Sequence, residues 1–120
     1  MELNGKQTGM NPAKKRIGPT LEKTIEKHLG EKVRRLGCLF YKFSCPGHRG
    51  VPDRIIMMPN GHTIFAELKT DSGQPSPAQR YHVLVMSAHG VDARILYGME
   101  DANRLADEIA AELEQQKHGV

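Results

Sequence analysis

The chain has 120 residues, of which 38% are hydrophobic and 26% charged, and its mean hydropathy is −0.51. These values predict one soluble globular domain and exclude a membrane-spanning segment, which needs roughly 20 consecutive apolar residues. Two cysteines are too few for a disulfide scaffold and favour a reducing, cytoplasmic setting. The absence of tryptophan, with only three tyrosines and three phenylalanines, argues against an aromatic base-stacking platform.

The net charge of +3 is unevenly distributed along the chain. Basic side chains dominate the first fifty residues, and acidic ones dominate the last twenty. This asymmetry suggests a polyanionic partner for the N-terminal half, with an ordinary solvated surface as the alternative. Residues 1–18 lack apolar periodicity and are predicted to form a flexible basic arm, whereas residues 19–120 are predicted to form a single domain.

Hydrophobic patterning and turn residues predict seven elements in the order α-β-β-β-α-β-α. They are a helix capped by Thr20 and ended by Gly37, strands at 38–43, 54–58 and 63–69, a helix begun by Ser76 and ended by Gly90, a strand at 91–97 and a helix at 100–116. The apolar side of the first helix is predicted to comprise Leu21, Ile25, Leu29 (or His28), Val33 and Leu36. That of the second is predicted to comprise Tyr81, Leu84, Val85 and Ala88. The order predicts an α/β fold with a mixed central β-sheet flanked by helices.

The loop of the predicted hairpin decides which residue lies opposite Asp53. A two-residue turn at Asn60-Gly61 would place Asp53 opposite Leu68. A three-residue loop, Pro59-Asn60-Gly61, would place Asp53 opposite Glu67. Proline in the first position and glycine in the left-handed position favour the three-residue loop. We therefore expect the two carboxylates to be paired across the strands.

Two opposed carboxylates require a positive charge nearby. At a separation of about 4 Å they would repel each other by about 4 kcal/mol at an effective dielectric constant of about 20. Lys69, on the same strand face as Glu67, supplies only one positive charge. A hard divalent cation with oxygen ligands, Mg²⁺ or Mn²⁺, would complete the balance. The alternative is a surface network in which Arg54 and Lys69 pair with the two acids.

Three motifs occur here in an order that resembles a known nuclease family. They are Gly50-Val51-Pro52-Asp53, Glu67-Leu68-Lys69 and Ser76-Pro77-Ala78-Gln79. Together they resemble the VRR-NUC family of the PD-(D/E)xK nuclease superfamily, in particular its stand-alone phage and bacterial members. The resemblance implies a restriction-endonuclease-like core and an enzyme that hydrolyses phosphodiester bonds with Mg²⁺ or Mn²⁺.

The same resemblance implies roles for individual residues. Asp53 and Glu67 would bind the metal ion, together with the backbone carbonyl of Leu68. Lys69 would orient or polarise the attacking water and help to neutralise the phosphate in the transition state. This division is chemically reasonable, because a bound metal ion lowers the pKa of water and offsets charge on the phosphate.

Two further side chains have alternative explanations. The resemblance places Gln79 near the active site, whereas its spacing from Ser76 equally predicts a capping-box partner. The family pattern also includes an acid on the first helix, which matches Glu22 better than Glu26. Either glutamate could instead complement the dipole of the helix N-terminus.

The predicted function is that of a structure-specific DNA endonuclease that resolves Holliday junctions. Lys42, Arg49 and Arg54 are the predicted nucleic-acid contacts. The resemblance implies a homodimer acting on branched DNA, most of all on four-way junctions, in the cytoplasm of a bacterium or a phage-infected host. The alternatives are a non-catalytic nucleic-acid-binding module and a nuclease that acts on other DNA or RNA structures.

Overall fold

The computed structural model describes residues 21–118, and its elements follow the predicted order. They are α1 (Glu22–Arg35), β1 (Leu39–Lys42), β2 (Arg54–Met57), β3 (Thr63–Lys69), α2 (Pro77–Ala88), β4 (Asp92–Tyr97) and α3 (Gly98–His118). The predicted arm and the predicted cap Thr20 lie outside the described residues. Leu21 occupies the N-cap position of α1 and makes no side-chain cap. None of the described helices is both long enough and apolar enough to cross a membrane.

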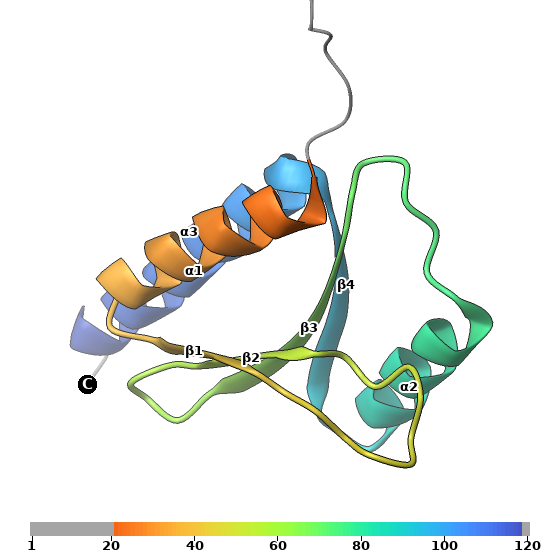
Figure 1. Cartoon of the computed structure of the whole chain (residues 1–120). Coiled ribbons are helices and arrows are strands. Elements are labelled where there is room, and N and C mark those ends of the chain that lie inside the picture. Colours follow the sequence, from red (N-terminus) through yellow and green to blue (C-terminus); the bar gives the residue numbers. More distant parts are fainter. Residues whose placement is uncertain (1–20, 119–120) are drawn as a thin grey trace, which may run out of the picture.

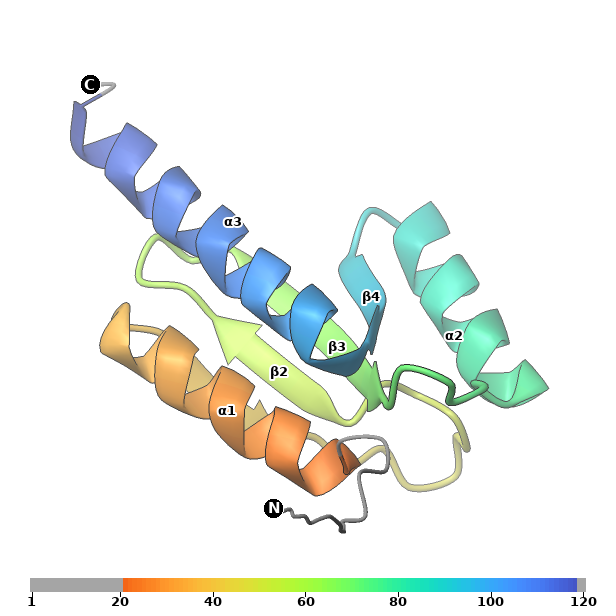
Figure 2. The ribbon, with the colours of Figure 1, turned by 90° about the horizontal axis from the view of Figure 1, so that it is seen from above.

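The four strands form one mixed sheet in the order β1-β2-β3-β4. The first three are antiparallel, and β4 runs parallel to β3 after the crossover through α2. Helices α1 and α3 lie side by side across one face of the sheet, while α2 lies apart from them beside β4 (Figures 1 and 2). This arrangement confirms the predicted mixed sheet flanked by helices.

The core fills the space between the sheet and the layer formed by α1 and α3. Its largest fully buried aliphatic side chains come from both layers: Ile25, Leu29, Val33, Ile56, Ile64, Leu68, Leu105 and Ile109. The apolar side predicted for α1 is thus confirmed over its central turns, although Leu21 at its start is 68% exposed. Each fully buried aliphatic side chain contributes roughly 1.5–3 kcal/mol, so this layer contact holds the sheet and helices together.

The hairpin between β2 and β3 has the predicted three-residue loop. The backbone N–H of Met58 donates to the carbonyl of His62 at 2.9 Å. Gly61 has a φ of +92°, in the left-handed region that the loop requires. The paired strands end at Arg54 opposite Ala66, so the same register continued by one residue places Asp53 opposite Glu67.

His62 links this hairpin to the far end of α3. Its Nδ1 lies 2.9 Å from a carboxylate oxygen of Glu112, and its Nε2 lies 2.8 Å from one of Asp92 on β4. The hydrogen bonds to Glu112 and then Asp92 raise the pKa of His62 above its ordinary value. Protonated, the ring donates to both carboxylates and connects three elements.

The prediction for the apolar side of α2 is wrong in part. The helix begins as predicted, since Ser76 and Gln79 form a reciprocal capping box. No residue of α2 is buried, however, and Tyr81 and Leu84 are 61% and 74% exposed. The helix contacts the sheet mainly through β4, so only a narrow strip of its surface is covered.

Candidate active site

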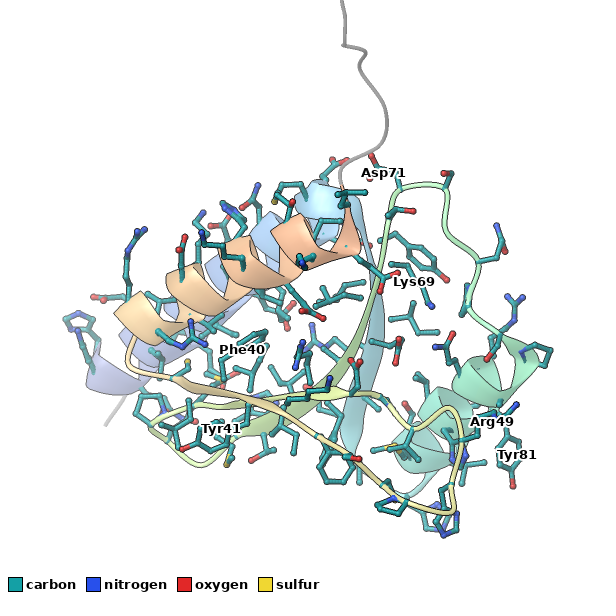
Figure 3. All side chains as sticks on the ribbon, viewed as in Figure 1. Phe40, Tyr41, Arg49, Lys69, Asp71 and Tyr81 are labelled. Atoms are coloured by element: carbon teal, nitrogen blue, oxygen red, sulfur yellow. The ribbon has the colours of Figure 1, made fainter. Side chains whose placement is uncertain are left out.

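The candidate site lies where β3 extends beyond its antiparallel partner. The pairing of β2 with β3 ends at Ala66, whereas β3 continues to Lys69 paired with β4 alone. The backbone of β3 is therefore not covered by β2 from Glu67 onward. Figure 3 shows Lys69 at this end of β3, close to the first turn of α1. Asp53, just before β2, lies opposite Glu67 at the same place.

Glu67 is the charged residue at the centre of this site, and it is only 6% exposed. The side-chain amide of Gln79 donates to its Oε2 at 3.1 Å, and the ammonium of Lys69 lies 3.9 Å from the same oxygen. Gln79 is thus the capping-box partner of Ser76 and also hydrogen-bonds to Glu67.

The electrostatics of Glu67 indicate a deficit of positive charge. Burial, followed by the negative charge of Asp53, raises the pKa of Glu67 from 4.5 to about 7. Lys69 acts in the opposite direction, and Glu22 adds to the rise. The carboxyl group is therefore close to half-protonated at neutral pH unless another cation is present.

The two glutamates of the first helix have different surroundings. Glu26 forms an ion pair with Arg54, in which Oε1 and Nη2 are 2.6 Å apart. Glu22 is exposed, and its negative charge acts on Glu67. Glu26 is thus engaged with Arg54, whereas Glu22 is close enough for its charge to act on Glu67.

A contact that sequence reasoning missed joins two of the three motifs. Gly50 has a φ of +92°, and a Cβ atom placed on it would lie 2.7 Å from the carbonyl carbon of Ala78. The loop that leads to Asp53 therefore packs directly on the first turn of α2, the turn that presents Gln79 to Glu67. The signal in the sequence is the glycine itself, since only glycine tolerates both the conformation and the close approach.

The donor atoms at the site suit a hard cation. The carboxylates of Asp53 and Glu67 and the carbonyl of Leu68 are all oxygen donors, and Mg²⁺ is typically held by one or two carboxylates with several waters. Within residues 21–118, no three His, Cys, Asp or Glu side chains converge closely enough to hold a metal ion by themselves. A site with two carboxylates and a backbone oxygen is compatible with that finding.

The three predicted nucleic-acid contacts are separated in the structure. Arg49 is exposed in the loop before β2 and lies near Tyr81 of α2, away from Lys69 (Figure 3). Lys42 and Arg54 instead line a groove between α1 and β1. The side chain of Arg54 is only 14% exposed because it packs beneath α1.

Comparison with known proteins places this fold among nucleases. A solved structure described as "VRR_NUC domain" superposes with a TM-score of 0.68 at 25% sequence identity, covering 72% of this chain and 94% of that chain. "Putative nuclease p44" of Acyrthosiphon pisum secondary endosymbiont phage 1 is 52% identical over 58 residues. That match spans 48% of this chain and 62% of the phage protein, which is less than two thirds of its length. No protein-family model matches the chain.

The mixed sheet, the flanking helices and the superposed structure define a restriction-endonuclease-like α/β protein. Within that class, the chain is similar in fold and sequence to a solved VRR-NUC domain.

Proposed function

We propose that this protein is a divalent-metal-dependent endonuclease that hydrolyses phosphodiester bonds. The observation that carries the proposal is the buried carboxylate of Glu67, opposite Asp53 and contacted by Lys69 and Gln79. A buried carboxylate with an unfavourable negative neighbour is a poor structural element but a good ligand for a cation. The name of the phage relative supports the same class of activity.

Each residue of the site has a distinct part in this proposal. Asp53, Glu67 and the carbonyl oxygen of Leu68 hold Mg²⁺ or Mn²⁺. When bound, the ion supplies a lowered water pKa and positive charge for the phosphate. Lys69 orients the attacking water and offsets the negative charge that develops on the phosphate oxygens. Gln79 fixes the orientation of the Glu67 carboxylate through its hydrogen bond.

The proposed substrate is branched DNA, with the four-way junction first, and the proposed assembly is a homodimer. One chain of this size carries one site, whereas a two-fold dimer presents two equivalent sites to a substrate with two-fold symmetry. Large apolar side chains exposed on β1 and α2 support self-association: Leu39, Tyr41, Tyr81 and Leu84. The proposed compartment is the reducing cytoplasm of a bacterium or phage-infected cell, where the two free cysteines would remain reduced.

A cleavage assay with matched DNA substrates tests the proposal. A labelled four-way junction, a linear duplex and a single strand of shared sequence are incubated with Mg²⁺, with Mn²⁺ or with EDTA. We expect metal-dependent cleavage of the junction, and loss of cleavage in Asp53→Asn with the fold retained. Asp107→Asn, an exposed acid of α3, is the matched control and should cleave normally.

The outcomes separate the candidate functions. Cleavage by Asp53→Asn at the wild-type rate would contradict the proposed site. Binding of DNA by the wild type without metal-dependent cleavage of any substrate would favour a non-catalytic module. Cleavage of linear or single-stranded nucleic acid in preference to the junction would retain the nuclease and remove the junction specificity.

A further inference from the structure

A groove of about 330 Å³ runs between α1 and β1. The residues that line it include five cations and one acid: Lys23, Lys27, Arg34, Lys42, Arg54 and Glu26, with Phe40 as the remaining member. We call it the α1–β1 groove. Such an excess of one sign of charge in a hollow concentrates the positive potential there.

The cations of α1 form a single row along the groove. Lys23, Lys27 and Arg34 are separated by four and seven residues, and these spacings bring side chains to the same side of a helix. Gly30 lies between them, and a Cβ atom there would lie 2.8 Å from Cδ2 of Phe40. The absence of a side chain at Gly30 therefore lets Phe40 form the floor of the groove.

Phe40 and Glu26 hold two of the cations in place. The Cζ atoms of Arg34 and Arg54 lie 5.4 Å and 5.9 Å from the centre of the Phe40 ring, within the range of cation–π attraction. Glu26 is paired with Arg54 at 2.6 Å. The acid of the groove is thus already engaged.

Apart from Arg54, the four cations of the groove pair with no carboxylate of residues 21–118. Among the ion pairs of residues 21–118, none joins a carboxylate to Lys23, Lys27, Arg34 or Lys42. Lys42 faces the row on α1 from the other side of the groove. A row of three cations on α1 faced by Lys42, none of them paired with an acid of the described residues, suits a ligand that carries regularly spaced negative charges.

The groove begins next to the candidate active site along the chain. Lys23 follows Glu22 in the chain, and Arg54 follows Asp53. From Lys23 to Arg34 the helix rises about 16 Å, which corresponds to about five nucleotides along one strand of duplex DNA.

We propose that the α1–β1 groove binds the phosphodiester backbone of the DNA that flanks the bond to be cut. The inference rests on the proposed nuclease function and extends it by assigning Lys23, Lys27 and Arg34 to substrate binding. Contacts of this kind carry no sequence information and position the strand relative to the active site.

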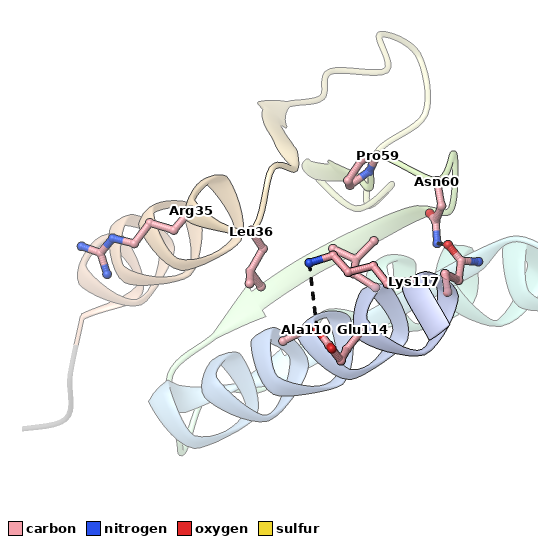
Figure 4. Close-up of a pocket in the computed structure, with 9 residues that line it drawn as sticks. Arg35, Leu36, Pro59, Asn60, Ala110, Glu114 and Lys117 are labelled. Carbon is pink, nitrogen blue, oxygen red and sulfur yellow. Dashed lines mark hydrogen bonds and ion pairs between the residues drawn. The ribbon is translucent and has the colours of Figure 1, made fainter. Parts of the chain in front are cut away.

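Two double variants of the same helix test the inference. Lys27→Gln/Arg34→Gln removes two positive charges from the groove. Lys32→Gln/Arg35→Gln removes the same charge from the side of α1 that faces α3, where both residues line a different pocket. Arg35 also lines the pocket between the ends of α1 and α3 and the hairpin loop (Figure 4).

Binding of a fluorescein-labelled DNA duplex is measured by anisotropy in EDTA between about 50 and 200 mM salt. We expect the groove variant to bind more weakly. Its plot of the logarithm of the association constant against the logarithm of the salt concentration should be less steep by about 1.8, or about 0.9 for each phosphate that is no longer neutralised. The Lys32/Arg35 variant should keep the wild-type slope. Equal affinity and slope in the two double variants would overturn the inference.

Failure of the inference can be distinguished from failure of the proposed function. If the wild type cleaves DNA but the groove variant binds it as the control does, only the groove is refuted. If the groove variant loses affinity but the wild type never cleaves with Mg²⁺, only the nuclease is refuted. Thermal unfolding of each variant shows whether it is folded. If Lys27→Gln/Arg34→Gln is unfolded, Lys23→Gln/Lys27→Gln replaces it, because that variant keeps the contact of Arg34 with Phe40.

Discussion

Glu67 makes the stability of the metal-free protein depend on pH, and this dependence can be removed by a single substitution. Its pKa in the folded state is about 7, compared with 4.5 in the ordinary case, chiefly because the carboxyl group is buried and secondly because Asp53 is near. The folded protein therefore binds the proton more tightly than the unfolded chain does. This tighter proton binding stabilises the folded state. The stabilisation is fully present below pH 4.5 and is lost as pH rises through about 7.

The size of this effect follows from the two pKa values. The interval between 4.5 and about 7, at about 1.36 kcal/mol for each pH unit, amounts to about 3 kcal/mol of unfolding free energy. Glu67→Gln keeps the shape of the side chain but cannot ionise. Relative to the wild type, the unfolding free energy of this variant should therefore increase by about 3 kcal/mol as pH rises across that interval.

Urea unfolding in EDTA, followed by circular dichroism over this pH range, measures the difference. Subtracting wild type from variant cancels the titration of all other groups. Glu31→Gln, an exposed acid of α1, is the control and should show a difference that does not change with pH. If the Glu67→Gln difference is equally flat, the buried carboxyl group does not have the electrostatic environment described above.

The same protein preparations test the metal site separately. Because a cation needs the ionised carboxylate, Mg²⁺ should raise the unfolding free energy of the wild type more above pH 7 than below pH 4.5. In Glu67→Gln this pH-dependent gain should be absent. A gain of the same size in both proteins would place the Mg²⁺ elsewhere.

Three other substitutions address the loop, the histidine and the exposed helix. Gly50→Ala should reduce stability and cleavage more than Gly47→Ala does, because both glycines have a positive φ but only Gly50 packs on Ala78. Equal reductions in unfolding and nuclease assays would contradict this. Hydrogen bonds that the protonated ring of His62 donates to Glu112 of α3 and Asp92 of β4 raise the pKa of His62. The stability advantage of wild type over His62→Gln should therefore be largest below pH 6.5 and decline as pH rises above it. An advantage that grows with pH in urea unfolding would refute that sign. Leu84→Asp should convert the proposed dimer to a folded monomer in analytical ultracentrifugation, and an unchanged sedimentation coefficient would remove α2 from the contact.

Local chemistry determined the features that depend on a few neighbouring residues. Pro59-Asn60-Gly61 specifies a three-residue loop, and that loop alone sets Asp53 opposite Glu67. Ser76-Pro77-Ala78-Gln79 likewise begins a helix through contacts within one turn. These features could be predicted because the interacting groups are close together in the chain.

Tertiary packing decided the features that depend on distant partners. The spacing of Glu22 and Glu26 could not show which of them Arg54 would engage, since that ion pair forms only when α1 lies on the sheet. Nor could the apolar pattern of α2 show that Tyr81 and Leu84 would remain exposed. A helix can carry apolar side chains on more than one of its sides, and the elements that pack against it determine which side is buried.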